Sequence, residues 1–404
     1  MTRSSAPDAS PVLTRAWESH ASGIEEIRRS LLARSWARDP AEQVRAQQFL
    51  MQAQAAAFNL VIAPDPLRPT FLLNTVFEPN LYTWLMPNPD CVYRYAFVDG
   101  AHSFQITGRT SHAHIAELQV IGGFWGDPDL ALLGNYDLTH FESEGDGSLE
   151  IFVGPEAPRA ARNWIKTDPA RVNTLILREI FLDWSAVGAS KVMIEPLEEP
   201  PGPRIPSEAA LAARLAASLR MIRFCIDAFS TGLTERVLEA VGWNRFQHVD
   251  TSRDEDAANP SIGYVPAIYD LGRDEALIIT LEPPEARYWN VHLGDLWWQV
   301  ADFTYRQSSL NGQQVERDAD GRVRLVISAE DPGLANWLDP GGAQKGVALV
   351  RWHSSRATPV PSITRTAFAR LRDHLPSATR EVSPAERRLS LHARRRGVLR
   401  RCVP

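Results

Sequence analysis

Three short segments combine residue types that could transfer protons or hold a small molecule. The first, residues 88–93, reads Asn-Pro-Asp-Cys-Val-Tyr. An aspartate at a loop-to-strand junction, three residues before a tyrosine, could supply an acid/base pair if its carboxylate is partly desolvated. Asn and Asp also cap turns through nearby backbone amides, and this structural role is an equally good interpretation. We take Asp90 and Tyr93 as candidate catalytic residues and Asn88 as a candidate substrate-binding residue.

The second segment begins at Gly108 and contains His112, His114 and Glu117. Alternation along a strand would place both imidazoles on one face, which is how β-barrel proteins gather metal ligands. The spacings on both sides of the histidines are shorter than in cupin metal motifs, and alternation turns Glu117 to the other face. We therefore assign His112 and His114 to substrate binding and predict no metal. A metal-dependent, cupin-like enzyme that uses these two histidines is the alternative.

The third segment, residues 288–298, reads Tyr-Trp-Asn-Val-His-Leu-Gly-Asp-Leu-Trp-Trp. On a strand, Tyr288, Asn290 and His292 would share one face. His292 could act as a general acid or base or orient a substrate, although a histidine hydrogen-bonded within a sheet is the commoner case. We predict His292 as a third catalytic residue, with Tyr288, Asn290 and Trp298 in substrate binding.

Composition excludes several classes of function. A net charge of −6 argues against broad nucleic-acid binding, which usually needs a basic surface. The three cysteines are far apart, so neither a disulfide framework nor a zinc site is indicated. We find no secretion signal and no apolar run of membrane-spanning length, and therefore expect a cytoplasmic protein without stable membrane insertion. Phosphate-binding glycine loops, nucleophile elbows and nucleotide fingerprints are absent from the sequence, so we predict no cofactor.

The elements that must position these residues carry an internal repeat. An Asp-Gly pair, an Asn-Trp pair and an arginine occur twice in this order, and their separations agree to within one residue. The first set is Asp146-Gly147, Asn163-Trp164 and Arg178, and the second is Asp320-Gly321, Asn336-Trp337 and Arg351. Residues 103–106 pair with residues 288–291 at a slightly larger separation. Such a repeat predicts two related β modules, and a site would then lie where the modules meet.

A feature present in both halves is expected to serve the fold of each module rather than one asymmetric active site. We therefore expect Asn163 and Asn336 to bond the backbone of a turn that the following tryptophan anchors. Arg178 and Arg351 are expected to pair with local carboxylates.

We predict a mainly β protein with helical additions (α+β), in which two antiparallel β-sandwich-like modules from an internal duplication are joined by helices. The expected parts are a helical segment at 1–85, a first β module at 86–200, a helical linker at 201–260, a second β module at 261–360, and a helix with a basic tail at 361–404. Ser207 should cap the first linker helix and Gly242 should end the last. A short helix is expected near residues 364–374. For the tail we favour a helix docked on the acidic body over binding to lipid or nucleic acid.

Several motifs in the second half resemble a known family. They are Asp318-x-Asp320-Gly321, Val326-Ile327-Ser328, Asp331-Pro332-Gly333, Asn336-Trp337-Leu338-Asp339 and Arg351-Trp352. This run resembles the domain of unknown function 1214, and residues 88–93 resemble the Asn-x-Asp-Thr-x-Tyr motif of its companion, domain of unknown function 1254, with Cys91 at the usual threonine. The resemblance covers most of the chain from about residue 85 and implies a β-sandwich architecture with helical additions. The family has no settled activity, so it implies a fold and not a function.

From the residues, we expect a cofactor-independent enzyme of the lyase, isomerase or hydrolase type that acts on a hydrophobic small molecule. A terpenoid, steroid or polyketide of secondary metabolism fits the tryptophan-rich modules, and the acid/base chemistry would be elimination, isomerisation or hydrolysis. The alternatives are the metal-dependent enzyme and a non-catalytic protein that binds small molecules or serves in assembly. Formation of a homo-oligomer is compatible with the sequence.

Overall fold

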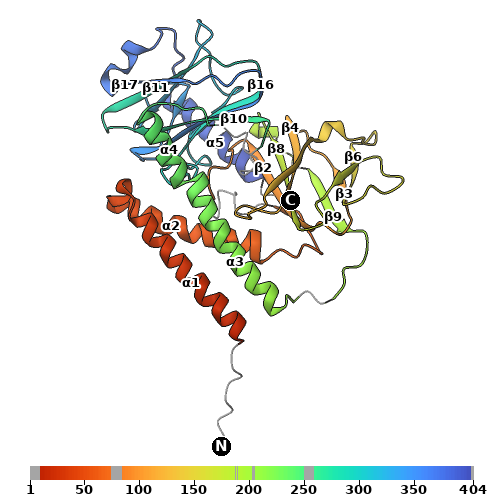
Figure 1. Cartoon of the computed structure of the whole chain (residues 1–404). Coiled ribbons are helices and arrows are strands. Elements are labelled where there is room, and N and C mark those ends of the chain that lie inside the picture. Colours follow the sequence, from red (N-terminus) through yellow and green to blue (C-terminus); the bar gives the residue numbers. More distant parts are fainter. Residues whose placement is uncertain are drawn as a thin grey trace, which may run out of the picture.

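The computed structural model describes residues 10–73, 84–186, 188, 190–202, 205–249 and 259–401, in which five α-helices accompany two β modules (Figure 1). The helices are α1 (Pro11–Leu32), α2 (Pro40–Ala57), α3 (Glu208–Phe224), α4 (Thr231–Val241) and α5 (Pro384–Arg401). Parts of the predicted segments, residues 1–9, 74–83, 203–204 and 250–258, lie outside the described residues.

Each β module is a sandwich of two sheets. The first module contains β1 (Leu72–Leu73), β2 (Cys91–Asp99), β3 (Phe104–Arg109), β4 (Ile115–Gly122), β5 (Ala131–Asp137), β6 (Ser148–Gly154), β7 (Trp164–Lys166), β8 (Val172–Ile180) and β9 (Lys191–Pro196). The second contains β10 (Ile262–Asp270), β11 (Glu275–Leu281), β12 (Ala286–Gly294), β13 (Ser309–Asn311), β14 (Val323–Ser328), β15 (Trp337–Leu338), β16 (Lys345–Ser355) and β17 (Ser362–Ala367).

The strand orders confirm the duplication. In the first module the sheets run β1-β2-β8-β4-β5 and β7-β6-β3-β9, and in the second β10-β16-β12-β13 and β15-β14-β11-β17. Apart from β1, each strand of the first module has a counterpart at the same place in the second. Gly147 and Gly321, in the turns before β6 and β14, share a φ of 80°, a left-handed conformation that favours glycine. The predicted mainly β architecture with two related modules is therefore correct.

One predicted correspondence is wrong. Residues 103–106 belong with β3, whose counterpart is β11, whereas residues 288–291 lie in β12, the counterpart of β4. In both segments an aromatic residue stands two positions before a β-branched one, and this similarity reflects strand composition and not position in the fold.

The repeated Asn-Trp pair closes the same turn in both modules, as predicted. Asn163 Oδ1 accepts from the Glu142 amide at 2.9 Å and its Nδ2 donates to the Glu142 carbonyl at 2.8 Å. Asn336 makes the same pair of bonds with Glu316, at 2.9 and 2.7 Å. The indoles of the following tryptophans donate to backbone carbonyls at the ends of β6 and β14.

We expect Asn163→Ala and Asn336→Ala to lower the free energy of unfolding by similar amounts, each about 2 kcal/mol, because each leaves backbone groups of a turn without partners. Thermal or denaturant unfolding of the two variants measures this. A loss confined to one variant would contradict the equivalence of the two turns.

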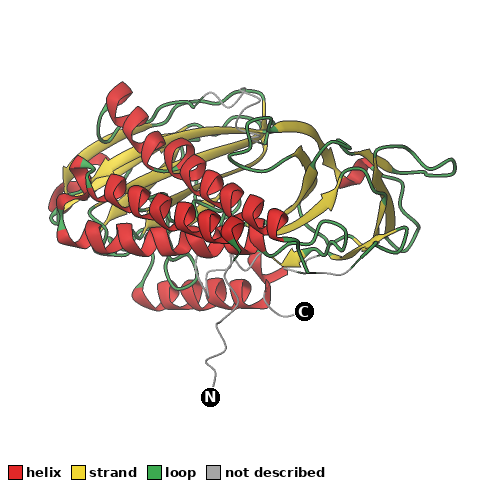
Figure 2. Cartoon of the chain, turned by 60° about the horizontal axis from the view of Figure 1, so that its bottom comes forward, coloured by secondary structure: helices red, strands yellow, loops and turns green. Residues whose placement is uncertain are grey.

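The helices α1, α2 and α3 form a layer on one side of the sheets (Figure 2). Both α1 and α2 pack against α3. The buried residues of this layer include Phe49 of α2 and Ile222 of α3, which share a core with Tyr95, Phe97 and Ile176 on the outward face of the first sheet. The helical layer and the first module therefore form one apolar core.

The helix boundaries follow their predicted signals. The Ser207 hydroxyl accepts from the Ala210 amide at 3.2 Å and begins α3, and α4 ends at Gly242 with a φ of 74°. Between these helices the chain makes a π-helical turn at Cys225–Phe229. This turn carries Phe229 toward the space between the modules.

The C-terminal part corrects one prediction and confirms another. Residues 364–367 belong to β17, and only Phe368–His374 forms a short 3₁₀ helix. The basic tail forms α5, which is docked on the body by Arg387 paired with Asp331 at 2.9 Å and by Arg394 stacked 4.3 Å from the Trp184 ring. Within the described ranges, the helices are too short or too polar to cross a membrane.

Candidate functional site

Two equivalent rows of side chains face each other where the modules meet. In the first module, Tyr93 of β2 lies beside Arg178 of β8, which lies beside Glu117 of β4. In the second module, Tyr264 of β10 lies beside Arg351 of β16, followed by Asn290 of β12. Neighbouring residues of each strand point into the module's own core, so alternation sends these rows outward.

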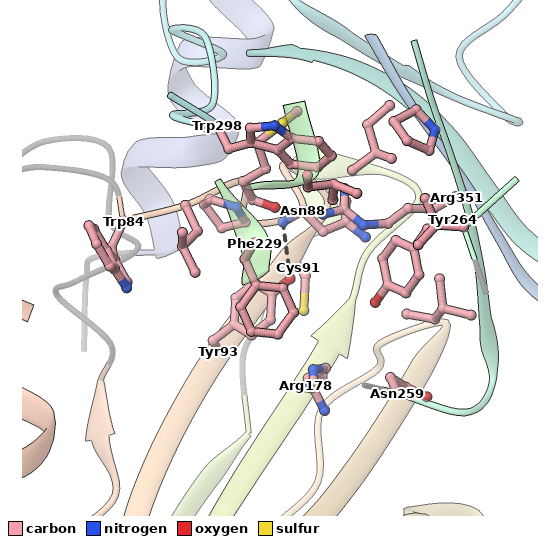
Figure 3. A pocket seen from close by; sticks show the side chains of 18 of the residues that line it. Trp84, Asn88, Cys91, Tyr93, Arg178, Phe229, Asn259, Tyr264, Trp298 and Arg351 are labelled. Carbon is pink, nitrogen blue, oxygen red and sulfur yellow. Dashed lines mark hydrogen bonds between the residues drawn. The ribbon is translucent and has the colours of Figure 1, made fainter. Parts of the chain in front are cut away.

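A cavity of about 210 Å³ lies between the rows and the helical layer (Figure 3). Its apolar lining includes Trp84, Met86, Trp125, Phe229, Ile262 and Leu349. Its polar lining includes Tyr93, Glu117, Arg178, Asn259, Tyr264 and Arg351. A concave, mainly apolar cavity with a few converging polar groups is typical of a small-molecule site. The cavity lies between the modules, the place at which the internal repeat predicts a site.

The two repeated arginines differ in their contacts. Arg351 is buried, its Nη1 donates to the imidazole of His292 at 2.8 Å, and its Nη2 donates to the Met86 carbonyl at 2.6 Å. Arg178 is half-buried, and its Nη1 is enclosed with no hydrogen-bond partner among the described residues. Neither side chain forms an ion pair with a carboxylate in that part of the chain, so their predicted pairing is wrong.

His292 is fully buried and accepts a hydrogen bond from Arg351. Burial, followed by the positive charge of Arg351, holds the pKa of His292 well below its usual value. A neutral imidazole can accept the hydrogen bond that the guanidinium donates. His292 does not line the cavity, and its predicted catalytic role stays a prediction that this geometry does not favour.

Glu117 is a buried carboxylate in the cavity wall. Its Oε2 accepts from the Asn259 amide at 2.8 Å, and its Oε1 lies 3.2 Å from His353 Nε2. Burial would raise the pKa of Glu117, but its neighbours His353 and Asn259 outweigh this effect and lower the pKa to about 2. Glu117 is therefore ionised at neutral pH, and both of its oxygens are engaged.

Asp90 is buried in a network that joins the modules. One carboxylate oxygen accepts from Trp184 Nε1 at 2.7 Å and Asn311 Nδ2 at 2.8 Å. The other accepts from the Tyr288 hydroxyl at 2.6 Å and Asn290 Nδ2 at 3.1 Å. Asp90 does not line the cavity. Because its carboxylate accepts four hydrogen bonds, it is better suited to holding the modules together than to exchanging a proton with a substrate.

The other predicted residues divide between the cavity and this network. Asn88, Tyr93 and Trp298 line the cavity. Asn88 Oδ1 also accepts from Asn290 Nδ2 at 2.8 Å, and its backbone amide donates to the Tyr93 hydroxyl at 3.0 Å. Tyr288 and Asn290 lie behind the lining, and burial raises the pKa of Tyr288 well above its usual value. Their roles in binding stay predictions.

His112 and His114 are not on a strand. Both are exposed in the loop before β4, and His114 Nε2 lies 2.8 Å from the Arg287 carbonyl. The predicted shared strand face is therefore wrong. No group of three or more His, Cys, Asp or Glu side chains in the described parts of the chain is arranged to hold a metal ion. The metal-dependent alternative has no ligand set there.

Sequence reasoning missed Arg178, Glu117, Asn259 and Tyr264 as site residues. A signal was present, because each repeated arginine follows an apolar run, Leu175–Leu177 or Ala348–Val350, and pairs with a tyrosine on the neighbouring strand. We interpreted the repetition as a sign of a purely structural role. The duplication instead gives each of the two cavity walls a tyrosine beside an arginine, Tyr93 with Arg178 and Tyr264 with Arg351.

A comparison with solved structures supports the fold. A crystal structure of an uncharacterised protein from Burkholderia cenocepacia matches 89% of this chain and 99% of its own, with a TM-score of 0.80 and 25% sequence identity. A second match is the VPA0106 protein from Vibrio parahaemolyticus, with a TM-score of 0.48, 13% identity, and coverage of 78% of this chain and 96% of its own. No curated protein matches.

The family model described as "Protein of unknown function (DUF1214)" matches residues 127–180 and 272–355. The first region includes strands β5–β8 and the second β11–β16, so one model matches corresponding parts of both modules. The resemblance to the companion domain 1254 stays a prediction. The DUF1214 model therefore matches the second module, where the Asn-Trp-Leu block predicts the resemblance, and also part of the first module.

Proposed function

We propose that the cavity between the modules binds a small, mainly apolar molecule, and that the protein converts this molecule by acid/base chemistry without a cofactor. The observation that carries the binding part is the cavity itself, with its aromatic lining and few converging polar groups. A cavity of about 150 Å³ holds one benzene ring, so the 210 Å³ here favours a single-ring or short-chain compound over a four-ring steroid.

Proton-transfer groups are present at the cavity wall. The phenols of Tyr93 and Tyr264 and the carboxylate of Glu117 all line it. Such groups can support elimination, isomerisation or hydrolysis if a substrate atom comes within hydrogen-bond reach. We therefore keep the reaction class that the sequence suggests. Its candidate proton-transfer residues are now Tyr93, Tyr264 and Glu117, and no longer Asp90 and His292.

Non-catalytic binding is a second candidate, and one observation favours it. Burial raises the pKa of Tyr93 far above neutrality, and Glu117 is held ionised by its partners. Neither group is therefore poised to exchange a proton near neutral pH. A protein that only binds its ligand would need no such group.

The test uses a variant that fills the cavity. Ala228 lies half-buried in the π-helical turn at the cavity wall, so we expect Ala228→Trp to block entry without removing core contacts. The matched control is Ala216→Trp, at an exposed position on α3. Each protein is incubated in D₂O with a mixture of small apolar metabolites, and bound and altered compounds are identified by mass spectrometry.

We expect the parent protein and Ala216→Trp to retain the same compounds in similar amounts. Ala228→Trp should retain at most a tenth of the amount that the parent protein retains. Deuterium incorporation or a new product would support acid/base catalysis. Retention without chemical change would favour the binding protein. Equal retention by all three proteins would contradict the proposal, because the cavity would then not be the binding site.

A further inference from the structure

Within the described residues, the two repeated arginines differ in whether the fold supplies acceptors for their guanidinium groups. Arg351 donates to His292 and to the Met86 carbonyl. Arg178 lies in the cavity wall with an enclosed Nη1 that has no hydrogen-bond partner there. The duplication therefore leaves one guanidinium satisfied and presents the other to the cavity (Figure 3).

An enclosed Nη1 donor without an acceptor is costly, because it has lost its hydrogen bonds to water and gained no replacement. Its cross-strand neighbour Glu117 does not supply one, since both carboxylate oxygens are turned to Asn259 and His353. The neighbour on the other side, Tyr93, accepts from the Asn88 amide. Acceptor oxygens on a bound molecule would satisfy this donor.

We propose that Arg178 binds the carboxylate of a small organic acid whose apolar part lies among Trp84, Trp125 and Phe229. This inference rests on the proposed function and narrows it to a class of ligand, the aryl and short-chain alkyl carboxylates. The planar fork of an arginine matches a carboxylate in a bidentate geometry.

A monoanion fits the cavity better than a phosphate ester. A doubly charged phosphate would need several donors, whereas the described wall offers one arginine without a partner. The ionised Glu117 in the same wall would also repel a dianion more strongly than a monoanion. The large apolar share of the lining requires that the rest of the ligand be uncharged.

Three probes of the same size separate the head group from the apolar part. They are phenylacetate, the neutral phenylethanol and the cationic phenylethylamine, and calorimetry gives their dissociation constants with the full chain. For the parent protein, we expect phenylacetate to bind at least tenfold more tightly than phenylethanol, because a hydrogen bond to a charged group adds at least that factor. The amine should bind most weakly.

The variant Arg178→Met keeps the apolar stem and removes the guanidinium. We expect it to lose the preference for phenylacetate while its affinity for phenylethanol stays within about threefold of the parent value, since methionine retains the apolar contacts. The matched control Arg109→Met removes an exposed arginine of the same module, on β3, and should keep the preference. The melting temperature of Arg178→Met should equal or exceed the parent value, because an enclosed unpaired donor is gone.

Equal affinity of the parent protein for phenylacetate and phenylethanol would overturn the inference and leave the proposed function intact. Loss of the preference in Arg109→Met as well would also overturn it, because a general positive potential would then explain acid binding. If the parent protein binds none of the three probes, both the inference and the proposed function are contradicted.

Discussion

Replacement of Asp90 by asparagine is expected to lower the free energy of unfolding by about 3 kcal/mol or more. An asparagine places an amide nitrogen where one carboxylate oxygen now accepts two hydrogen bonds. Either Trp184 and Asn311, or Tyr288 and Asn290, would then face a donor instead of an acceptor. Denaturant unfolding of the variant and the parent protein measures the difference.

The same change should weaken ligand binding indirectly. Residues 84–88 precede Asp90 and line the cavity, so a loosened network would let this wall move. The control Asp146→Asn alters an exposed aspartate in a turn of the first module and should cost under about 1 kcal/mol. If Asp90→Asn instead kept full stability and lost turnover, Asp90 would be a catalytic acid, as first considered from the sequence.

We also expect the free energy of unfolding to depend strongly on pH, because of Asp295, which begins the turn after β12. Burial raises the pKa of Asp295 to about 7, against the amides of Gln299 and Trp297 and the charge of Arg45, which lower it. The folded protein therefore binds a proton that the unfolded chain has already lost between about pH 4 and pH 7. Stability contributed by this proton is present at low pH and is lost as the pH rises through about 7.

Relative to Asp295→Asn, the parent protein should lose up to about 3 kcal/mol of stability between pH 5 and pH 8. This is an upper bound, because Asp295 keeps part of its surface exposed. Asparagine can accept the same bonds from the Trp297 and Gln299 amides but does not titrate. The control Asp302→Asn, at an exposed turn nearby, should differ from the parent protein in free energy of unfolding by the same amount at every pH. A pH-independent difference between the parent protein and Asp295→Asn would contradict the raised pKa of Asp295.

Much of the architecture could be predicted from the sequence because the signals are local and repeated. The Asp-Gly turns and the Asn-Trp pairs recur in order, and Ser207 and Gly242 carry capping preferences that act within a few residues. The prediction for the histidine pair failed because a local pattern does not fix where a strand begins. Polar and apolar residues alternate from Glu117 to Val120, but β4 begins only at Ile115, after His112 and His114.

The site could not be predicted to the same extent. The row of Tyr93, Arg178 and Glu117 forms only when three strands that are far apart in sequence pair in one register. Register depends on the packing of whole sheets and cannot be read from a single strand. The asymmetry between Arg178 and Arg351 depends further on His292 of a neighbouring strand and on the Met86 carbonyl, which are distant from Arg351 in sequence.

The most direct test of the account is a crystal structure of the protein grown with phenylacetate. We expect electron density for the acid in the cavity between the modules, with the ring against Trp84 or Phe229 and the carboxylate within hydrogen-bond distance of the Arg178 guanidinium. Density for the acid only on the outer surface, with the cavity filled by protein side chains or water alone, would contradict the claim that the duplicated modules form a small-molecule site.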